Sequence, residues 1–196
     1  MRLLFVHAHP QADSFTAACR DTAMQAARAQ GHDVKLIDLY AEGFAPSLTA
    51  EEWLAYPDPD AIPDSLAPHI EALQWAEGLI FTHPTWWSGP PAILKGWLDR
   101  CLRPGVAFHI HGKTLRPGLA NIRLLGVITS LGATWAQYNL LLGAPGRRKF
   151  LRSLRVCTHV RCKTLWLAHY AIDASTEASR ASHLAKIAAR IAQIAV

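Results

Sequence analysis

Two adjacent tryptophans, Trp86 and Trp87, stand in the segment of this chain that is best suited to hold a flat ligand. They follow an apolar run at residues 78–82 that is typical of a buried strand. A Gly-Pro-Pro sequence at residues 89–91 then stops the segment before an expected helix at 92–102. Loops lie at the surface, so two large aromatic side chains in a turn gain little from burial. The pattern predicts that a planar ligand lies along this turn.

The loop between the first expected strand and the first expected helix offers an anion site. A helix N-terminus presents unpaired N–H groups and the positive end of the helix dipole, which favour phosphate. Ser14 and Thr16 add hydroxyls there, and His9 can add a ring donor. An ordinary capped helix beside a strand-end histidine explains His9 equally well. Neither of the usual glycine-rich phosphate loops of dinucleotide- or triphosphate-binding proteins is present.

A third candidate loop follows the fourth expected strand. Its small residues, Ser130 and Gly132 among them, allow backbone to approach the edge of a ring. Tyr138 in the same segment can donate a hydrogen bond to a substrate carbonyl. The alternative is a tyrosine on a surface loop with no role in chemistry.

Metal and nucleophilic chemistry are poorly supported. His7 with His9, and His109 with His111, form two His-x-His pairs, but no Asp or Glu stands beside either pair. We therefore expect no metal site. The chain also lacks the Gly-x-Ser-x-Gly sequence of a nucleophile elbow.

Strands alternate with helices along the whole chain, which predicts a parallel sheet covered on both faces. The expected strands span 2–8, 34–39, 78–83, 121–130 and 163–168, and the expected helices span 14–30, 66–77, 92–102, 147–154 and 175–194. A long proline-rich connection at 40–64, with a short helical piece around 49–53, is expected to be functional. We predict one α/β domain over residues 1–196, a doubly wound five-stranded sheet of flavodoxin-like order 2-1-3-4-5. Such sheets bind ligands at the carboxyl ends of the first and third strands, where the two candidate loops begin.

Composition narrows the class further. The 196 residues are 51% hydrophobic, as expected of an ordered globular protein, and carry a formal net charge of +5. That charge suits anionic ligands such as nucleotide phosphates and is too weak and too evenly spread for nucleic acid. We expect no membrane span and no signal peptide, and four cysteines without Cys-x-x-Cys spacing indicate reduced thiols in the cytoplasm.

Three stretches of this sequence match a known family. They are His9-Pro10 with Asp13-Ser14-Phe15, the run from Pro84 to Arg100, and residues 104–108. On these residues the chain resembles the flavodoxin-like NAD(P)H:quinone oxidoreductase family, the DT-diaphorase and bacterial quinone reductase group. The likeness extends over about residues 1–140.

The resemblance implies a non-covalently bound flavin, NAD(P)H as co-substrate and a homodimer with the flavin at the subunit interface. By position, one group of residues would hold the phosphate and ribityl chain: His9, Ser14, Phe15 and Thr16. A second group would lie along the flavin ring, mostly through backbone groups: Pro84, Thr85, Trp86 and Trp87, with Ser130 and Gly132 at the ring edge.

The chain departs from the family pattern in two places. Leu131 stands where members often carry the first of two glycines, and Ala144 and Pro145 fall where the animal enzymes carry a histidine after the tyrosine. A Tyr–His proton relay therefore does not carry over, and Tyr138 remains the one candidate for a catalytic donor. The missing C-terminal extension of the animal enzymes favours FMN, with FAD as the alternative.

The predicted function is a ping-pong enzyme in which NAD(P)H reduces the flavin and a quinone or similar acceptor then takes two electrons. Two alternatives remain open. An electron-carrier flavodoxin is usually acidic, whereas this chain is basic. A flavin-binding regulatory subunit of a membrane transporter would use helix 92–102 and the basic residues at 147–155 as docking surfaces.

Overall fold

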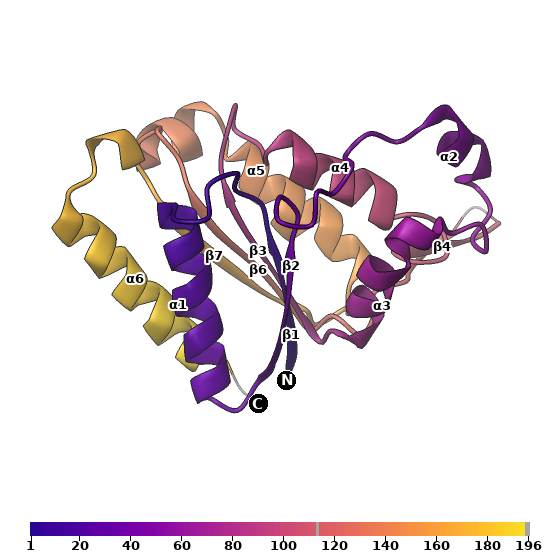
Figure 1. The fold of residues 1–196 in the computed structure, drawn as a ribbon, viewed down its shortest axis with the longest axis horizontal. Helices are drawn as coiled ribbons and strands as arrows, with labels where there is room; N and C mark the ends of the chain where they lie inside the picture. The colour runs from indigo at the N-terminus through magenta and orange to yellow at the C-terminus, as the bar shows by residue number, and fades with distance from the viewer. Residues whose placement is uncertain (113, 195–196) are drawn as a thin grey trace.

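A five-stranded parallel sheet forms the centre of the protein (Figure 1). The computed structural model describes residues 1–112 and 114–194, apart from the side chain of His111. The strand order is β2-β1-β3-β6-β7, which confirms the predicted order 2-1-3-4-5 and the flavodoxin-like fold class. The strands are β1 (Arg2–His7), β2 (Asp33–Asp38), β3 (Gly78–Pro84), β6 (Leu124–Ser130) and β7 (Lys163–His169).

Helices cover both faces of the sheet. One face is covered by α1 (Phe15–Ala29) and α6 (Glu177–Ala192), which pack side by side (Figure 1). The other face carries α3 (Ala67–Trp75), α4 (Ala92–Cys101) and the segment that begins with α5 (Pro145–Arg148) (Figure 1). No helix in the described ranges is both long enough and apolar enough to cross a membrane.

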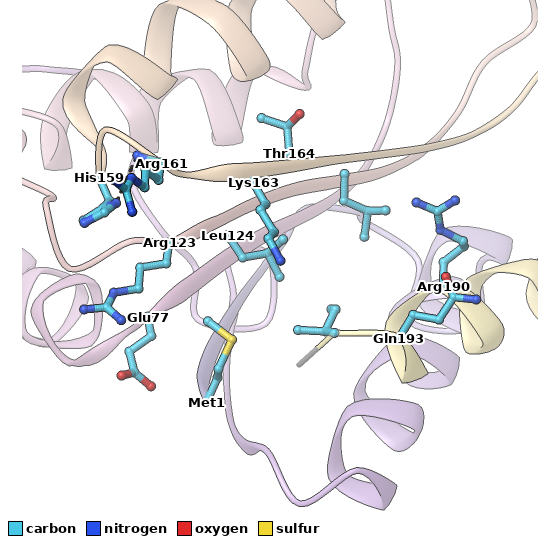
Figure 2. Close-up of a pocket in the computed structure, with 12 residues that line it drawn as sticks. Met1, Glu77, Arg123, Leu124, His159, Arg161, Lys163, Thr164, Arg190 and Gln193 are labelled. Atoms are coloured by element: carbon cyan, nitrogen blue, oxygen red, sulfur yellow. Dashed lines mark hydrogen bonds between the residues drawn. The ribbon is translucent and has the colours of Figure 1, made fainter. Parts of the chain in front are cut away.

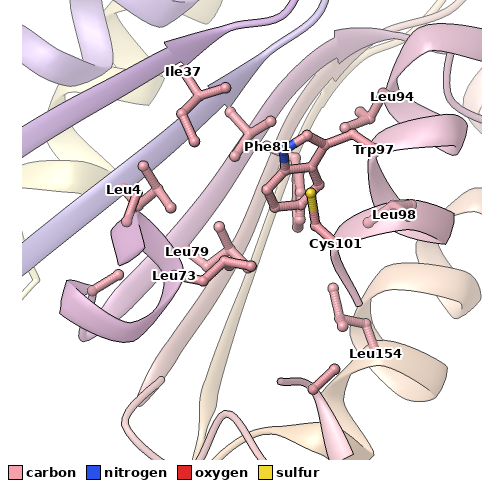
Figure 3. Close-up of a cluster of buried hydrophobic side chains, with 14 of the residues drawn as sticks. Leu4, Ile37, Leu73, Leu79, Phe81, Leu94, Trp97, Leu98, Cys101 and Leu154 are labelled. Carbon is pink, nitrogen blue, oxygen red and sulfur yellow. The ribbon is translucent and has the colours of Figure 1, made fainter. Parts of the chain in front are cut away.

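The central strand β3 contributes to two hydrophobic clusters. Leu79 and Phe81 pack with Trp97 of α4 on one face, as Figure 3 shows. Ile80 points to the opposite face and joins the cluster that holds Ile187 of α6. Successive side chains of a strand alternate between faces, so a strand buried on both sides carries a continuous apolar run, here from Leu79 to Phe81.

The long connection after β2 is anchored to α4. Its short helix α2 (Ala50–Ala55) was expected, and its Thr49–Glu52 capping box satisfies backbone N–H groups at its start. Glu52 also forms an ion pair with Arg100 of α4, and both side chains are largely buried. Arg100 further donates to the carbonyl of Ala45 at 2.6 Å. A charge that is buried and paired with several acceptors fixes the path of this connection on the sheet.

Several predicted boundaries are wrong. The strand expected at 121–130 begins only at Leu124, because the Asn121 amide donates to the carbonyls of Leu73 and Ala76 and so caps the end of α3. The helix expected at 147–154 is instead α5 followed by a π-helical turn, η3 (Lys149–Ser153), and a 3₁₀ turn, η4 (Leu154–Cys157).

Some short elements were not expected at all. They are the antiparallel pair β4 (Phe108–His111) and β5 (Thr114–Pro117), the π-helical turn η2 (Gln137–Leu141), and the 3₁₀ turns η1 (Asp64–Leu66) and η5 (Ile172–Ala174).

Gly96 inside α4 has a steric reason. A Cβ at this position would lie 2.1 Å from the carbonyl oxygen of Pro46, inside the anchored connection. The backbone of the connection therefore leaves no room for a side chain at this position of α4.

We predict that Gly96→Ala lowers the free energy of unfolding by about 1–2 kcal/mol. Overpacking against rigid backbone should cost ~2–3 kcal/mol, the upper part of the usual range, and helix propensity returns about 1 kcal/mol. Urea denaturation measures the change. Gly89→Ala is the matched control, since its added methyl group meets only the Trp86 oxygen at 3.9 Å. Equal stability of the Gly96 variant and the unmodified protein would contradict the packing argument.

Candidate functional site

The carboxyl ends of β1, β3 and β6 meet at one edge of the sheet. In the strand register His7 pairs with Thr82, and Pro84 pairs with Ser130. Beyond this ladder, the backbone N–H of Thr85 donates to the Ser130 carbonyl at 2.7 Å, and the hydroxyls of Thr85 and Thr129 lie 2.8 Å apart. The three loops that the sequence singled out therefore begin side by side.

The tryptophan pair occupies a tight two-residue hairpin turn. Trp86 and Gly89 exchange both backbone hydrogen bonds, at 2.9 and 3.0 Å. Between them, Trp87 and Ser88 have φ angles of 49° and 61°, the geometry of a type I′ turn. The Trp87 side chain is fully exposed, and the Trp86 side chain is 45% exposed. The turn is therefore strained, and it presents indole surface to solvent.

Hydrogen bonding within the turn leaves few backbone donors for a ligand. The N–H groups of Thr85 and Trp86 are already used, and proline at 84 has none. Among the described residues, the N–H groups of Trp87 and Ser88 have no acceptor. A ring lying on this turn would therefore meet the Trp87 and Ser88 amides, and Ser88 is a contact that the sequence analysis missed.

The first loop forms the expected helix N-terminus. Ser14 caps α1 by accepting from the N–H of Ala17 at 3.1 Å. Within the described chain, the N–H groups of Phe15 and Thr16 have no acceptor. The Phe15 ring packs edge-on against His169, with 5.4 Å between ring centroids. Phe15 can therefore offer a phosphate only its backbone.

His9 links this loop to the tryptophan turn. Its ring centroid lies 6.4 Å from that of Trp86. The His9 Nδ1 atom lies 3.0 Å from the backbone nitrogen of Gln11 and 3.1 Å from its carbonyl oxygen, so Nδ1 contacts Gln11 in either tautomer. The Nε2 atom is therefore the ring nitrogen that can face an anion. The structure thus brings the predicted phosphate and ring segments to the same place.

Tyr138 lies under the turn and is fully buried, so the alternative of a surface tyrosine is wrong. Its ring is nearly parallel to that of Trp166, with centroids 6.2 Å apart. Its hydroxyl accepts from the N–H of Arg147 at 3.1 Å. A Cβ on Gly146 would lie 2.8 Å from this hydroxyl and 3.0 Å from the Ser88 carbonyl oxygen, so the three groups are closely packed.

The Tyr138 hydroxyl remains a hydrogen-bond donor at neutral pH. Burial raises the pKa of Tyr138, and the group accepts a hydrogen bond without spending its own hydrogen on a described residue. The structure therefore places a neutral O–H directly behind the tryptophan turn.

The glycine in the third loop serves packing within the chain. A Cβ on Gly132 would lie 2.5 Å from a carboxylate oxygen of Asp173. Ser130 is mostly buried, and its carbonyl is used by Thr85. Contact of Ser130 and Gly132 with a bound ring stays a prediction.

The two His-x-His pairs were the candidates for metal ligation in the sequence. Within 1–112 and 114–194, no group of three or more His, Cys, Asp or Glu side chains is placed to hold a metal ion. The His111 side chain lies outside the described residues.

Two comparisons decide the family. The profile of a family described as having a flavodoxin-like fold matches residues 1–194. The mouse protein ribosyldihydronicotinamide dehydrogenase [quinone] (Mus musculus) is 30% identical over 98% of this chain and 91% of its own length. The chain belongs to the flavodoxin-like NAD(P)H:quinone oxidoreductase family. The expected enzyme class, NAD(P)H dehydrogenase (quinone), is confirmed at the level of this family.

Other members of the family and structures of the same fold extend these findings. The rat protein NAD(P)H dehydrogenase [quinone] 1 (Rattus norvegicus) is 32% identical over 71% of this chain, a match that spans 56% of the rat protein. The crystal structure of Smu.1420 from Streptococcus mutans superposes with a TM-score of 0.87 at 26% identity, covering 99% of this chain and all of that one. NAD(P)H:quinone oxidoreductase from Methanothermobacter marburgensis has the same fold, with a TM-score of 0.81 at 24% identity over 98% of this chain and 94% of its own.

We predict that Ser88→Gly raises the free energy of unfolding by about 1 kcal/mol, because glycine adopts the left-handed backbone region without the cost of a side chain. Ser47→Gly is the matched control. Ser47 lies in an exposed loop and does not have a positive φ angle. The Ser47→Gly protein should therefore be as stable as the unmodified protein or slightly less stable. Thermal unfolding of both variants measures the difference. A destabilised Ser88→Gly protein would show that the turn is not strained.

Acid is predicted to destabilise the site through His83, which is buried beside Pro84. Its Nδ1 contacts the Pro84 carbonyl at 2.9 Å, its Nε2 has no partner among the described residues, and burial lowers the pKa of His83 to about 4. The unfolded chain, with an ordinary histidine pKa of about 6.5, binds more protons between pH 6.5 and 4. The free energy of unfolding should therefore fall as the pH drops through that range, by up to about 3 kcal/mol from this residue.

His83→Asn keeps a donor near the position of Nδ1 and removes the titrating ring. Urea denaturation at pH 7, 5.5 and 4.5 should show a smaller loss of stability in this variant than in the unmodified protein. Identical losses would mean that His83 does not contribute.

Proposed function

We propose that this protein is a flavin-dependent NAD(P)H oxidoreductase that reduces quinones or similar acceptors. The observation that carries the proposal is the meeting of two features at one edge of the sheet. The N-terminus of α1, with two amides that lack acceptors among the described residues, lies beside an exposed tryptophan turn, and the rings of His9 and Trp86 join them. A phosphate and a planar ring carried by one molecule would suit this pair of surfaces.

The first surface fits a phosphate group. The N–H groups of Phe15 and Thr16 and the Ser14 hydroxyl are donors at the positive end of the α1 dipole. The His9 ring adds a donor when Nε2 carries the hydrogen. The net charge of +5 adds a weak attraction for an anion. We assign the phosphate and ribityl chain to these four residues.

The second surface fits the ring. Pro84, Thr85, Trp86 and Trp87 would lie along it, with the free amide of Trp87 as the main donor from the chain. The Thr85 hydrogen bonds to Thr129 and Ser130 hold the turn in place, so the donor is positioned before a ligand arrives. When bound, a flavin supplies a ring that takes hydride from NAD(P)H and then passes two electrons to the acceptor in a ping-pong sequence.

FMN is the flavin that we propose. Two structures with the same fold support it: the FMN-dependent NADH-azoreductase of Bacillus anthracis and general stress protein 14 of Treponema denticola, both in complex with FMN. These two proteins share only 12% and 21% identity with this chain. FAD remains the alternative.

Tyr138 is proposed as the donor that supports the reaction. Its neutral hydroxyl lies against Gly146 and beside the Ser88 carbonyl, so it can stabilise negative charge that develops near the turn. Ala144 and Pro145 lie nearby, so no histidine follows the tyrosine to relay a proton. The protein's task is therefore positioning and exclusion of water, with Tyr138 as an auxiliary donor.

A homodimer with the flavin site at its interface is also proposed. Large apolar side chains are exposed on the tryptophan turn and on the segment that contains η2: Trp87, Trp135, Leu140, Leu141 and Leu142. A contact with a second copy of the chain would bury them. We also propose a cytoplasmic location, which the four free cysteines support. The family match over residues 1–194 supports a single flavin-binding domain.

The test is steady-state oxidation of NADH and NADPH by the FMN-loaded protein with a quinone acceptor. We predict that Trp87→Ala lowers kcat/KM about tenfold, a loss of ~1.4 kcal/mol, because the exposed indole would pack on the reacting rings. Trp53→Ala is the control, since Trp53 is also exposed but lies on α2. No NAD(P)H oxidation by the unmodified protein would contradict the function, and equal kinetics of the Trp87 variant would contradict the role of the turn.

A further inference from the structure

A second cleft lies at the opposite edge of the sheet, where the strands begin. It has a volume of about 730 Å³ and is lined by Met1, the starts of β6 and β7, and the end of α6 (Figure 2). The strands are six or seven residues long, so this cleft is about 20 Å from the tryptophan turn at ~3.3 Å per residue. Ligands of this fold normally bind at the carboxyl ends of the strands. The fold alone therefore does not account for a cleft at their amino ends.

Positive side chains surround the cleft. Arg123, Arg161, Lys163 and Arg190 line it, and Figure 2 shows Arg123 and Arg161 on one side and Arg190 on the other. Within the described part of the chain, none of the four has a carboxylate within 4 Å. Four like charges around one concavity repel each other and create a strong positive potential.

The acidic residue that lines the cleft does not neutralise these charges. Glu77 accepts from the backbone N–H of Arg2 at 2.9 Å and lies 3.8 Å from the Arg2 guanidinium. The pKa of Glu77 is lowered, chiefly by the hydrogen bond from the Arg2 backbone. The positive charges of Arg2 and Arg123 lower it further by smaller amounts. One carboxylate that is already engaged with Arg2 leaves the cleft with excess positive charge.

Hydrogen bonds hold the backbone of Arg123 and Lys163 in place. The N–H of Arg123 donates to the Glu77 carbonyl at 2.7 Å, and the N–H of Lys163 donates to the Arg123 carbonyl at 2.9 Å. The His159 ring accepts from the N–H of Arg161 at 3.0 Å, which orders the turn before β7. A ligand would therefore not have to order the backbone that carries these charges.

Apolar side chains also line the cleft. Leu124 and Leu165 are each 7% exposed, and Met1 and Ile194 lie at its margin. Volumes of roughly 300–1,000 Å³ with apolar walls and a few charged groups are typical of small-molecule sites. Nucleic acid would require a longer basic stripe than this local group of charges.

We propose that this cleft binds a nucleotide-like small molecule, with its phosphates between Arg123, Arg161 and Lys163 and its ring on the apolar side chains. Arginine and lysine at one site are the usual recognition groups for phosphates. Because the cleft is far from the flavin edge, the bound molecule takes no part in electron transfer. The assignment stands independently of the oxidoreductase function.

Calorimetric titration of the 196-residue protein, loaded with one equivalent of FMN in about 0.15 M salt, tests the proposal. One equivalent of FMN fills the flavin site without leaving free FMN to compete for the cleft, and the salt screens weak surface attraction. ATP and inorganic tripolyphosphate are the two probes. We expect one saturable site for ATP and weaker binding of tripolyphosphate, which has no ring.

Arg161→Ala/Lys163→Ala should weaken ATP binding by about tenfold or more, which corresponds to ~1.4 kcal/mol. Arg28→Ala/Lys186→Ala is the control: it removes the same charge from exposed positions outside the cleft and should change binding by less than about twofold. Both variants should keep the unmodified protein's quinone reductase turnover. The proposal is overturned if ATP shows no saturable binding, if tripolyphosphate binds as tightly as ATP, or if the control variant loses as much affinity.

Discussion

The hydrogen bonds that continue the β3–β6 ladder past the end of the sheet govern the geometry of the candidate site. Thr85 contributes a backbone bond to Ser130 and a side-chain contact with Thr129, both shorter than 2.9 Å. They hold the chain at the point where it leaves β3 and enters the tryptophan turn. They fix the direction in which the turn leaves the sheet, and with it the direction of its indoles and free amides.

This anchoring allows the turn to carry strain. Two successive non-glycine residues in the left-handed region cost about 1–2 kcal/mol each. The paired hydrogen bonds between Trp86 and Gly89 and the packing of Gly146 under Ser88 hold the turn in this shape. A strained turn that exposes a large aromatic side chain is unfavourable for stability alone. Its presence at the carboxyl edge of the sheet is therefore best explained by ligand binding.

Local patterns in the sequence predicted much of this arrangement. Apolar runs located the strands and Ser14 marked the start of α1, because both depend on residues near in sequence. The alternation of strands with helices then led to the flavodoxin-like strand order. The burial of Tyr138 could not be predicted, since the turn that carries it packs on Trp166 of β7, which is distant in the sequence. The left-handed backbone at Ser88 was also hidden, because glycine, the usual signal for that conformation, is absent there.

The basic cleft was even less predictable from the sequence than the burial of Tyr138. Its charged side chains come from positions 123, 161, 163 and 190, and only the folded sheet brings 123 and 163 together. In the sequence they are scattered cations in a chain of modest net charge. The protein thus has two edges with different surfaces: an aromatic one at the carboxyl ends of the strands and a cationic one at their amino ends.

The central claim is that a flavin lies between the N-terminus of α1 and the tryptophan turn. An NMR titration of ¹⁵N-labelled protein with FMN tests it most directly. The account predicts saturable shifts of the Phe15, Thr16 and Trp87 amides at one FMN per chain, with the amides of Arg123 and Lys163 unmoved. Saturable shifts confined to other parts of the chain, or no saturable shifts at all, would contradict it.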